Sequence, residues 1–306
     1  VCRLWRDLLP ANQSKDYGCL FAAQGKLNLL KWVASQGCNL YEHTCACAAR
    51  RGRIEVLKWL RETGCPWDQE TCYAAAKGGH FELLKWARSN ECHWNPNEIA
   101  SFAAEGGNLE LLKWVVKENG CPCYDLACTK AARGGHFEVL KWLEENRCEW
   151  DQDTMCYEAI GIGHLEMLKW LRSKGCTLDS DCFELAAELG NLEILKWLKE
   201  DRSWQGNSCV SGAARCGNVK VLEWLREVDC LMDMDESTMR RAAENGHLEA
   251  VKWLRETGCP WSESACECAA YAGHRDVLKW LIANGCPFDS IIIFASVVRH
   301  DDVETL

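Results

Sequence analysis

The stretch GHLEMLKWLRSKGC, residues 163 to 176, is unusually apolar for a chain with a formal charge of −10. Five of the seven residues in its LEMLKWL segment are apolar, and Glu166, Lys169 and Arg172 form a narrow polar stripe with a spacing of three. A helix at the edge of a domain needs only one apolar face. This helix therefore requires neighbours on two or three sides.

The neighbours are predicted to be copies of the same helix. The pair Lys-Trp, or a close variant, recurs ten times at intervals of 27 to 29 residues, which indicates a repeat array. Each unit contains an Ala-rich segment, a Gly-containing turn, the Trp helix and a loop. The helix tryptophans are Trp32, Trp59, Trp86, Trp114, Trp142, Trp170, Trp197, Trp224, Trp253 and Trp280.

Capping and turn residues mark the unit boundaries. Asp68 and Asp151, each with a threonine three residues later, can cap the first helix of a unit, because their side-chain oxygens accept hydrogen bonds from free N–H groups. A glycine seven residues before the tryptophan suits a tight reversal with positive φ. These glycines are Gly52, Gly79, Gly107, Gly135, Gly163, Gly190, Gly217, Gly246 and Gly273.

Packing between units explains why the pattern repeats. Burial of the tryptophan and its aliphatic neighbours stabilises by roughly 1.5 to 3 kcal/mol per side chain, which one unit alone cannot realise. Alanine pairs such as Ala75-Ala76 and Ala131-Ala132 let neighbouring backbones approach closely and complement the bulky Trp helix. We expect one array over residues 16–306, with ten repeats and a truncated eleventh, whose first helix would include SIIIFASVV (290–298).

Charge and hydropathy restrict the partner classes. The formal charge of −10 and the pI of about 5.4 disfavour nucleic acid and anionic membranes, since both require a concentrated basic face. The chain contains no apolar run long enough for direct membrane insertion. A protein partner with a basic surface is the favoured hypothesis.

The segments AARGGHFEVLKWL (131–143) and AAENGHLEAVKWL (242–254) resemble the ankyrin repeat. Ankyrin units have about 33 residues and a β-hairpin finger, whereas these units are shorter and the loop over 64–71 has no room for a full finger. The resemblance therefore implies an all-α, ankyrin-like helix-turn-helix solenoid with shortened or absent fingers. It also implies protein binding through a concave face, without catalysis or a cofactor.

Loop residues and residues on the first helix of each unit differ between units and are candidates for that binding surface. The alternative interpretation is an ordinary solvated helix surface, because few residues dominate even a real interface. The candidates are Asp68, Gln69, Tyr73, Lys77, Ser101, Thr129, Asp151, Gln152, Tyr157, Glu184, Ser211 and Arg240.

Loop tryptophans allow two interpretations as well. Trp67, Trp94, Trp150 and Trp261 each follow a helix tryptophan by eight residues. They could be exposed binding anchors, or they could fold back over the space left by the missing fingers. The second interpretation is favoured because the feature recurs.

The chain contains 22 cysteines, many of them at one repeat position in the loop. Neighbouring copies should lie about 8 to 10 Å apart, too far for disulfides. No Cys-x-x-Cys motif occurs, so no metal site is predicted. Reduced, buried thiols imply the cytoplasm or nucleus. A thiol-based metal or redox module stays an alternative, with Cys65 close to Cys72 and Cys259 close to Cys266.

Histidines of the Gly-His turns are expected to bond neighbouring backbone, a role that the resemblance to ankyrin turns supports. They occur at regular intervals, as at His80 and His136, and do not converge on one pocket. Catalysis requires a base beside a nucleophile or acid. The chain is therefore predicted not to be an enzyme.

Residues 1–15 precede the array and do not follow its spacing. VCRLWRDLL, residues 1–9, resembles the C-terminal helix of an F-box, which implies a cullin-ligase adaptor as a partner and substrate recognition by the repeats. The alternative is an N-terminal cap helix, because the end units of a solenoid need a cover.

Overall fold

The computed structural model describes residues 14–119, 125–201, 209–231 and 234–291. These residues form twenty α-helices and no β-strand, which confirms the all-α class and the missing fingers for this part of the chain. Contacts divide the chain into two compact units, Val1–Asp151 and Gln152–Leu306. The expectations for residues 1–9 and for the helix at 290–298 fall almost wholly outside the described residues.

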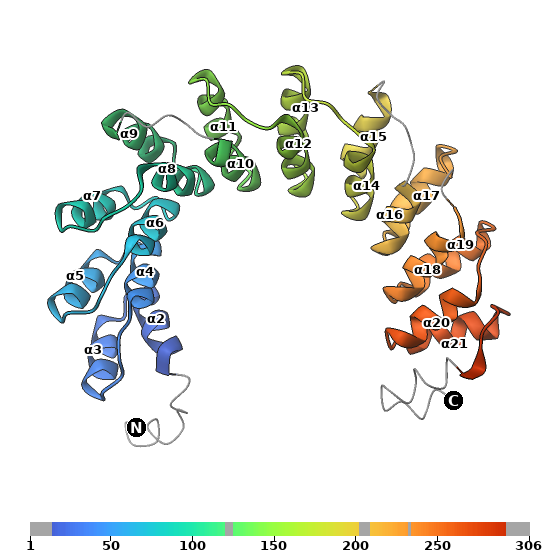
Figure 1. Ribbon diagram of the computed structural model, residues 1–306, viewed down its shortest axis with the longest axis horizontal. Coiled ribbons are helices and arrows are strands. Elements are labelled where there is room, and N and C mark those ends of the chain that lie inside the picture. The colour runs from blue at the N-terminus through green and yellow to red at the C-terminus, as the bar shows by residue number, and fades with distance from the viewer. Residues whose placement is uncertain (1–13, 120–124, 202–208, 232–233, 292–306) are drawn as a thin grey trace. The chain divides into compact units, whose positions relative to one another are not determined.

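The N-terminal unit is a stack of helix pairs (Figure 1), in which each first helix packs against the next first helix along the chain. The first helices are α2 (Ser14–Gln24), α4 (Glu42–Arg50), α6 (Gln69–Lys77), α8 (Pro96–Glu105) and α10 (Asp125–Arg133). The Trp helices are α3 (Leu27–Ser35), α5 (Ile54–Glu62), α7 (Phe81–Ser89), α9 (Leu109–Asn119) and α11 (Phe137–Glu145).

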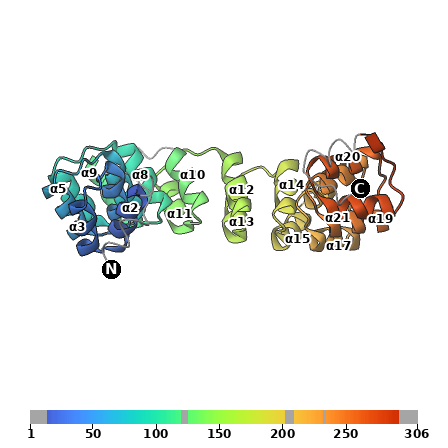
Figure 2. The ribbon, with the colours of Figure 1, turned by 90° about the horizontal axis from the view of Figure 1, so that it is seen from below.

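The C-terminal unit is built in the same way, and Figures 1 and 2 show its first helices and Trp helices as two rows. Its first helices are α12 (Gln152–Gly161), α14 (Ser180–Glu188), α16 (Cys209–Arg215), α18 (Glu236–Glu244) and α20 (Glu263–Tyr271). Its Trp helices are α13 (Leu165–Ser173), α15 (Leu192–Glu200), α17 (Val219–Glu227), α19 (Leu248–Glu256) and α21 (Arg275–Ala283).

The core of each unit lies between its two rows of helices. The alanine pairs are buried, as at Ala75 and Ala76, and so are the aliphatic residues of the Trp helices, such as Leu57 and Leu60. The tryptophans are less buried than the sequence predicts: among the ten helix tryptophans only Trp253 is buried, at 6% exposure. The smaller aliphatic side chains fill the interior, and the indoles lie along its rim.

Turns between the two helices of a repeat connect neighbouring repeats. All nine predicted turn glycines have positive φ, between 65° and 78°, as predicted. The residue after the glycine then reaches back to a carbonyl of the preceding first helix: His80 Nε2 lies 3.1 Å from the Arg50 oxygen, and Asn108 Nδ2 donates to the Ala76 oxygen at 3.0 Å. The predicted backbone bonding of the turn histidines is confirmed at His80, and the bond joins two repeats.

Candidate protein-binding face

The N-terminal unit has a hollow of about 160 Å³ on its first helices. Two repeat positions supply most of the lining, the residue before the alanine pair and the residue after it. The lining side chains are His43, Ala46, Cys47 and Arg50 from α4, Glu70, Tyr73, Ala74 and Lys77 from α6, and Phe102 from α8.

A row of charges adjoins this hollow. Glu105 of α8 receives hydrogen bonds from Lys77 of α6 at 2.5 Å and lies 3.3 Å from Lys130 of α10. Burial raises the pKa of Glu105, but the hydrogen bond from Lys77 and the charge of Lys130 outweigh burial, so the pKa lies below its usual value. The Lys130 ammonium is 3.6 Å from the ring centroid of Phe102. Three helices thus present a fixed, charged and partly aromatic surface.

Three of the predicted contact residues are buried, and this corrects the expectation that they lie on an exposed side. Tyr73 is 2% exposed and stacks on Phe102 with centroids 5.0 Å apart. Ser101 donates to the Asn97 carbonyl at 3.0 Å, and Ser211 accepts a hydrogen bond from Arg241. All three occupy the position two residues before the alanine pair, which faces the neighbouring first helix. These three side chains are covered there.

Three candidates at that same position in the C-terminal unit, Tyr157, Glu184 and Arg240, are partly exposed. Arg240 pairs with Glu244 at 3.1 Å, and Glu184 lies 4.0 Å from Arg241. The Tyr157 hydroxyl donates to Asp179 at 2.7 Å, and burial together with this carboxylate raises the tyrosine pKa. Their contact role stays a prediction, as does that of Thr129, which is partly exposed.

Loop candidates lie beside a second hollow in the N-terminal unit. Asp68 and Gln69 are exposed and, with Trp67 and His93, line a space of about 350 Å³. Asp68 also accepts a hydrogen bond from the Glu70 amide at 3.1 Å, which confirms it as a cap. Asp151 and Gln152, the corresponding pair before α12, are exposed as well.

Loop tryptophans fold back onto the next repeat. Trp67 packs edge-on against Trp86 with centroids 5.7 Å apart, and Trp261 packs in the same way against Trp280 at 6.4 Å. An arginine also lies over each of these two loop indoles: the Arg61 guanidinium is 4.4 Å from the Trp67 ring centroid, and that of Arg255 is 4.0 Å from the Trp261 ring centroid. All four predicted loop tryptophans are partly exposed, which places them between the two interpretations.

Two neighbouring helices of the C-terminal unit carry acidic residues without any basic residue. Together, α12 and α14 carry five acidic residues and no lysine or arginine. None of the five is buried. They are Asp153, Glu158, Asp181, Glu184 and Glu188.

Cysteines form pairs that differ from those expected. Cys45 Sγ lies 3.6 Å from Cys65 Sγ, and Cys128 Sγ lies 2.9 Å from Cys148 Sγ. Each pair joins a first helix to the loop at the end of the same repeat, with a spacing of twenty residues. Cys72 follows the same spacing, with its sulfur 4.0 Å from the Cys92 carbonyl oxygen. The suggested approach of Cys65 to Cys72 stays a prediction. The hydrogen bond between the thiols and burial raise the pKa of Cys45.

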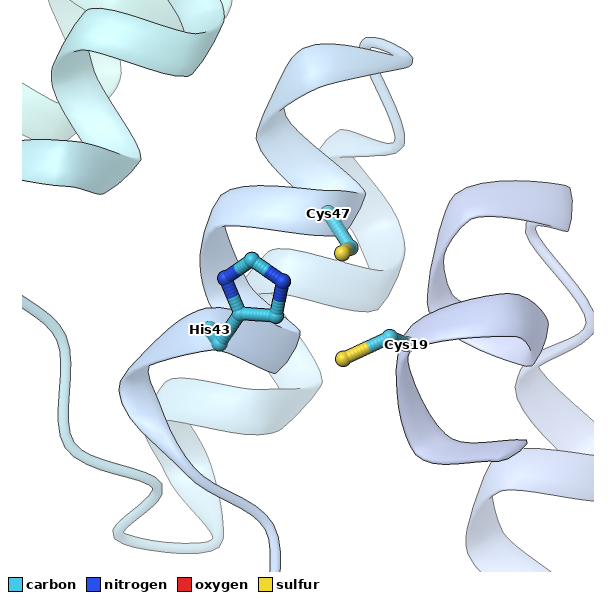
Figure 3. A group of neighbouring side chains, drawn as sticks. All are labelled: Cys19, His43 and Cys47. Atoms are coloured by element: carbon cyan, nitrogen blue, oxygen red, sulfur yellow. The ribbon is translucent and has the colours of Figure 1, made fainter. Parts of the chain in front are cut away.

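One group of possible metal ligands was missed in the sequence. Cys19 of α2 and His43 and Cys47 of α4 converge, and their donor atoms all lie within 4.8 Å of one another (Figure 3). The ligands come from two repeats, so no Cys-x-x-Cys motif marks them. The spacing of four between His43 and Cys47, which places both on one helix face, was the available signal.

Stacked helix pairs with a charged face and varied loops define a helical-repeat interaction module. Two family models match the chain: ankyrin repeats (3 copies) over residues 100–182, and ankyrin repeats (many copies) over residues 239–282. The chain contains ankyrin repeats in these two stretches, which confirms the resemblance. No curated protein matches it significantly. In the described residues, no helix has the length and apolarity to cross a membrane.

Proposed function

We propose that the chain is a non-enzymatic scaffold, or a structural subunit of an assembly, that holds a protein partner on its first helices and loops. One observation carries this proposal. The alanine pair is nearly constant, while the residue directly after it changes in charge and size from repeat to repeat. In chain order this residue is Gln24, Arg50, Lys77, Glu105, Arg133, Gly161, Glu188, Arg215, Glu244 and Tyr271.

The physical reason is that the alanine pair packs between helices, whereas the residue after it lies at the surface. The alanines must stay small because neighbouring first helices approach closely there, whereas the residue after them borders the hollow at Arg50 and Lys77. A partner would therefore meet a rigid surface whose chemistry differs at each step. Such preorganised surfaces bind with little loss of conformational entropy.

A matched pair of variants tests this surface. Arg50→Ala/Lys77→Ala changes the hollow, and Glu55→Ala/Lys58→Ala removes an exposed pair of α5 whose atoms lie 2.8 Å apart. We expect the first variant to lose the stoichiometric partners that full-length protein captures from its native cells, and the second to keep them. Equal capture by both variants would contradict the proposal.

A basic segment is the proposed partner chemistry for the face of α12 and α14, because five carboxylates and no cations lie on these helices. Two of the five, Glu184 and Glu188, pair with Arg241 and Arg215 of neighbouring helices. Attraction between exposed opposite charges raises the association rate and is screened by salt. Association with a captured partner should slow markedly between low and physiological ionic strength. Asp153→Asn/Asp181→Asn should reduce that salt dependence, and an unchanged slope would exclude this face.

A second candidate function is substrate recognition in an F-box-type ubiquitin ligase. The sequence VCRLWRDLL (1–9) favours it. Capture with and without the segment upstream of Asp16 distinguishes the two candidates. A cullin adaptor that disappears on truncation would support the ligase role, whereas identical partners without an adaptor would support the scaffold.

The cytoplasm or nucleus is the proposed location, because none of the nineteen cysteines that the structure describes is assigned to a disulfide. Cysteines that form no disulfide persist in reducing compartments. Microscopy of the tagged full-length protein, with membrane and luminal markers, tests this location directly.

A further inference from the structure

The geometry points to a zinc site made by Cys19, His43 and Cys47, which joins the first two repeats. The cluster lies on the N-terminal unit, where α2 packs against α4. Figure 3 shows the two sulfur atoms and the imidazole directed toward one another from these helices. The two sulfurs and one ring nitrogen of His43 all lie within 4.8 Å of one another.

The backbone arrangement explains the convergence. His43 and Cys47 are four residues apart in α4, so their side chains project from the same helix face. Cys19 comes from the neighbouring first helix, at the contact between the two repeats. Both helices belong to the stacked frame, and the ligands are therefore held on rigid elements rather than on loops.

The donor set suits zinc. Zinc binds thiolate sulfur at about 2.3 Å and imidazole nitrogen at about 2.0 to 2.1 Å in a tetrahedron, which corresponds to donor separations of roughly 3.5 to 3.8 Å. Because the donor atoms lie within 4.8 Å of one another, binding requires them to approach by at most about 1 Å. Hard cations such as Mg²⁺ and Ca²⁺ prefer oxygen ligands and are not favoured by two sulfurs and a nitrogen.

Charge and access are compatible with binding. Two thiolates neutralise a divalent cation, so the loaded site has no net positive charge that the neighbouring Arg50 side chain would repel. His43 is exposed, and both sulfurs are partly exposed. A zinc ion can thus enter from solvent. Three protein ligands leave a fourth position, which faces water or a donor from a partner at the edge of the hollow that His43 and Cys47 line.

Cys268 provides a matched control for non-specific metal binding by the many other thiols. The segment CECAA in α20 matches CACAA in α4, so Cys268 is the repeat equivalent of Cys47 and is also partly exposed. Ser264 stands where α4 has His43. Cys268→Ser removes a thiol from the same helical setting without touching the proposed ligands.

The test uses full-length protein purified under reducing conditions and freed of metal. Co²⁺ is added as a spectroscopic probe, and Zn²⁺ affinity is measured by competition with a chromophoric chelator. We expect one equivalent of Co²⁺ to give tetrahedral visible bands and a sulfur-to-cobalt charge-transfer band, and one equivalent of Zn²⁺ to displace it. His43→Ala and Cys47→Ser should weaken Zn²⁺ binding roughly tenfold or more, and Cys268→Ser should not.

Because His43 is exposed, His43→Ala should fold normally, and circular dichroism of each variant verifies this. Absence of the tetrahedral cobalt spectrum would overturn the site. Equal loss in Cys47→Ser and Cys268→Ser would overturn it as well, since it would show non-specific thiol binding. A Cys19–Cys47 disulfide in protein taken directly from its cells would exclude zinc in favour of oxidation.

Discussion

The contact between Gly52 and His80 allows the connection between repeats to be tested quantitatively. A Cβ atom on Gly52 would lie 2.5 Å from Nδ1 and 2.7 Å from Cε1 of His80, so Gly52→Ala must displace the ring. Displacement breaks the hydrogen bond from His80 to the Arg50 carbonyl, a loss of about 0.5 to 1.5 kcal/mol. The φ of +65° adds about 1 to 2 kcal/mol of strain for any residue with a Cβ.

Gly64→Ala is the matched control, because Gly64 has φ +77° and no heavy atom within 4 Å of its added Cβ. It should show the strain alone, about 1 to 2 kcal/mol, whereas Gly52→Ala should cost about 1.5 to 3.5 kcal/mol. Urea unfolding followed by circular dichroism measures both. In His80→Ala protein the excess cost of Gly52→Ala should vanish. Equal costs for the two glycines, or strict additivity with His80→Ala, would refute the reasoning.

Three further predictions concern charge and thiols. Burial lowers the pKa of His247 below 6.5 in the folded state. The stabilising contribution of His247 is therefore complete above about pH 6.5 and is lost as the pH falls through the folded pKa. His247→Asn should flatten the dependence of stability on pH over this range, and an identical pH dependence in the variant would contradict this prediction. Glu105→Gln should destabilise by roughly 1 kcal/mol in thermal unfolding, more than Glu55→Gln at an exposed pair. Native alkylation with mass spectrometry should modify exposed Cys216 before buried Cys45, and the reverse order would be inconsistent with the structure.

Sequence periodicity predicted the helix pairs and their turns because both depend on local rules. The positive φ of the turn requires glycine, and the close approach of helices requires the alanine pair. The same residues therefore recur in each repeat. The missing fingers also followed from loop length. The degree of tryptophan burial could not be predicted in this way. The pattern marks Trp142 as apolar, but it does not show that the aliphatic neighbours occupy the core and leave the indole at its rim.

Side-chain exposure on the first helices was harder to predict. Tyr73, Ser101 and Arg240 share one repeat position, yet the first two are buried and Arg240 reaches the surface. Side-chain length alone does not decide the outcome, because Tyr157 occupies the same position as Tyr73 and is partly exposed. Tyr73 is covered by the ring of Phe102, a neighbour that the pattern along one helix does not describe. Thiol contacts such as Cys45 with Cys65 depend on how the loop returns over its own repeat, which spacing along one helix does not describe.

The most direct test of the account is a hydrogen-exchange footprint of the full-length chain with and without a captured stoichiometric partner. We predict protection of amides in α4, α6 and α8 and in the loop at Asp68 and Gln69, with little change in the Trp helices α5, α7 and α9. Protection confined to those Trp helices, with the first helices unchanged, would contradict the proposal that this chain binds through its first-helix face.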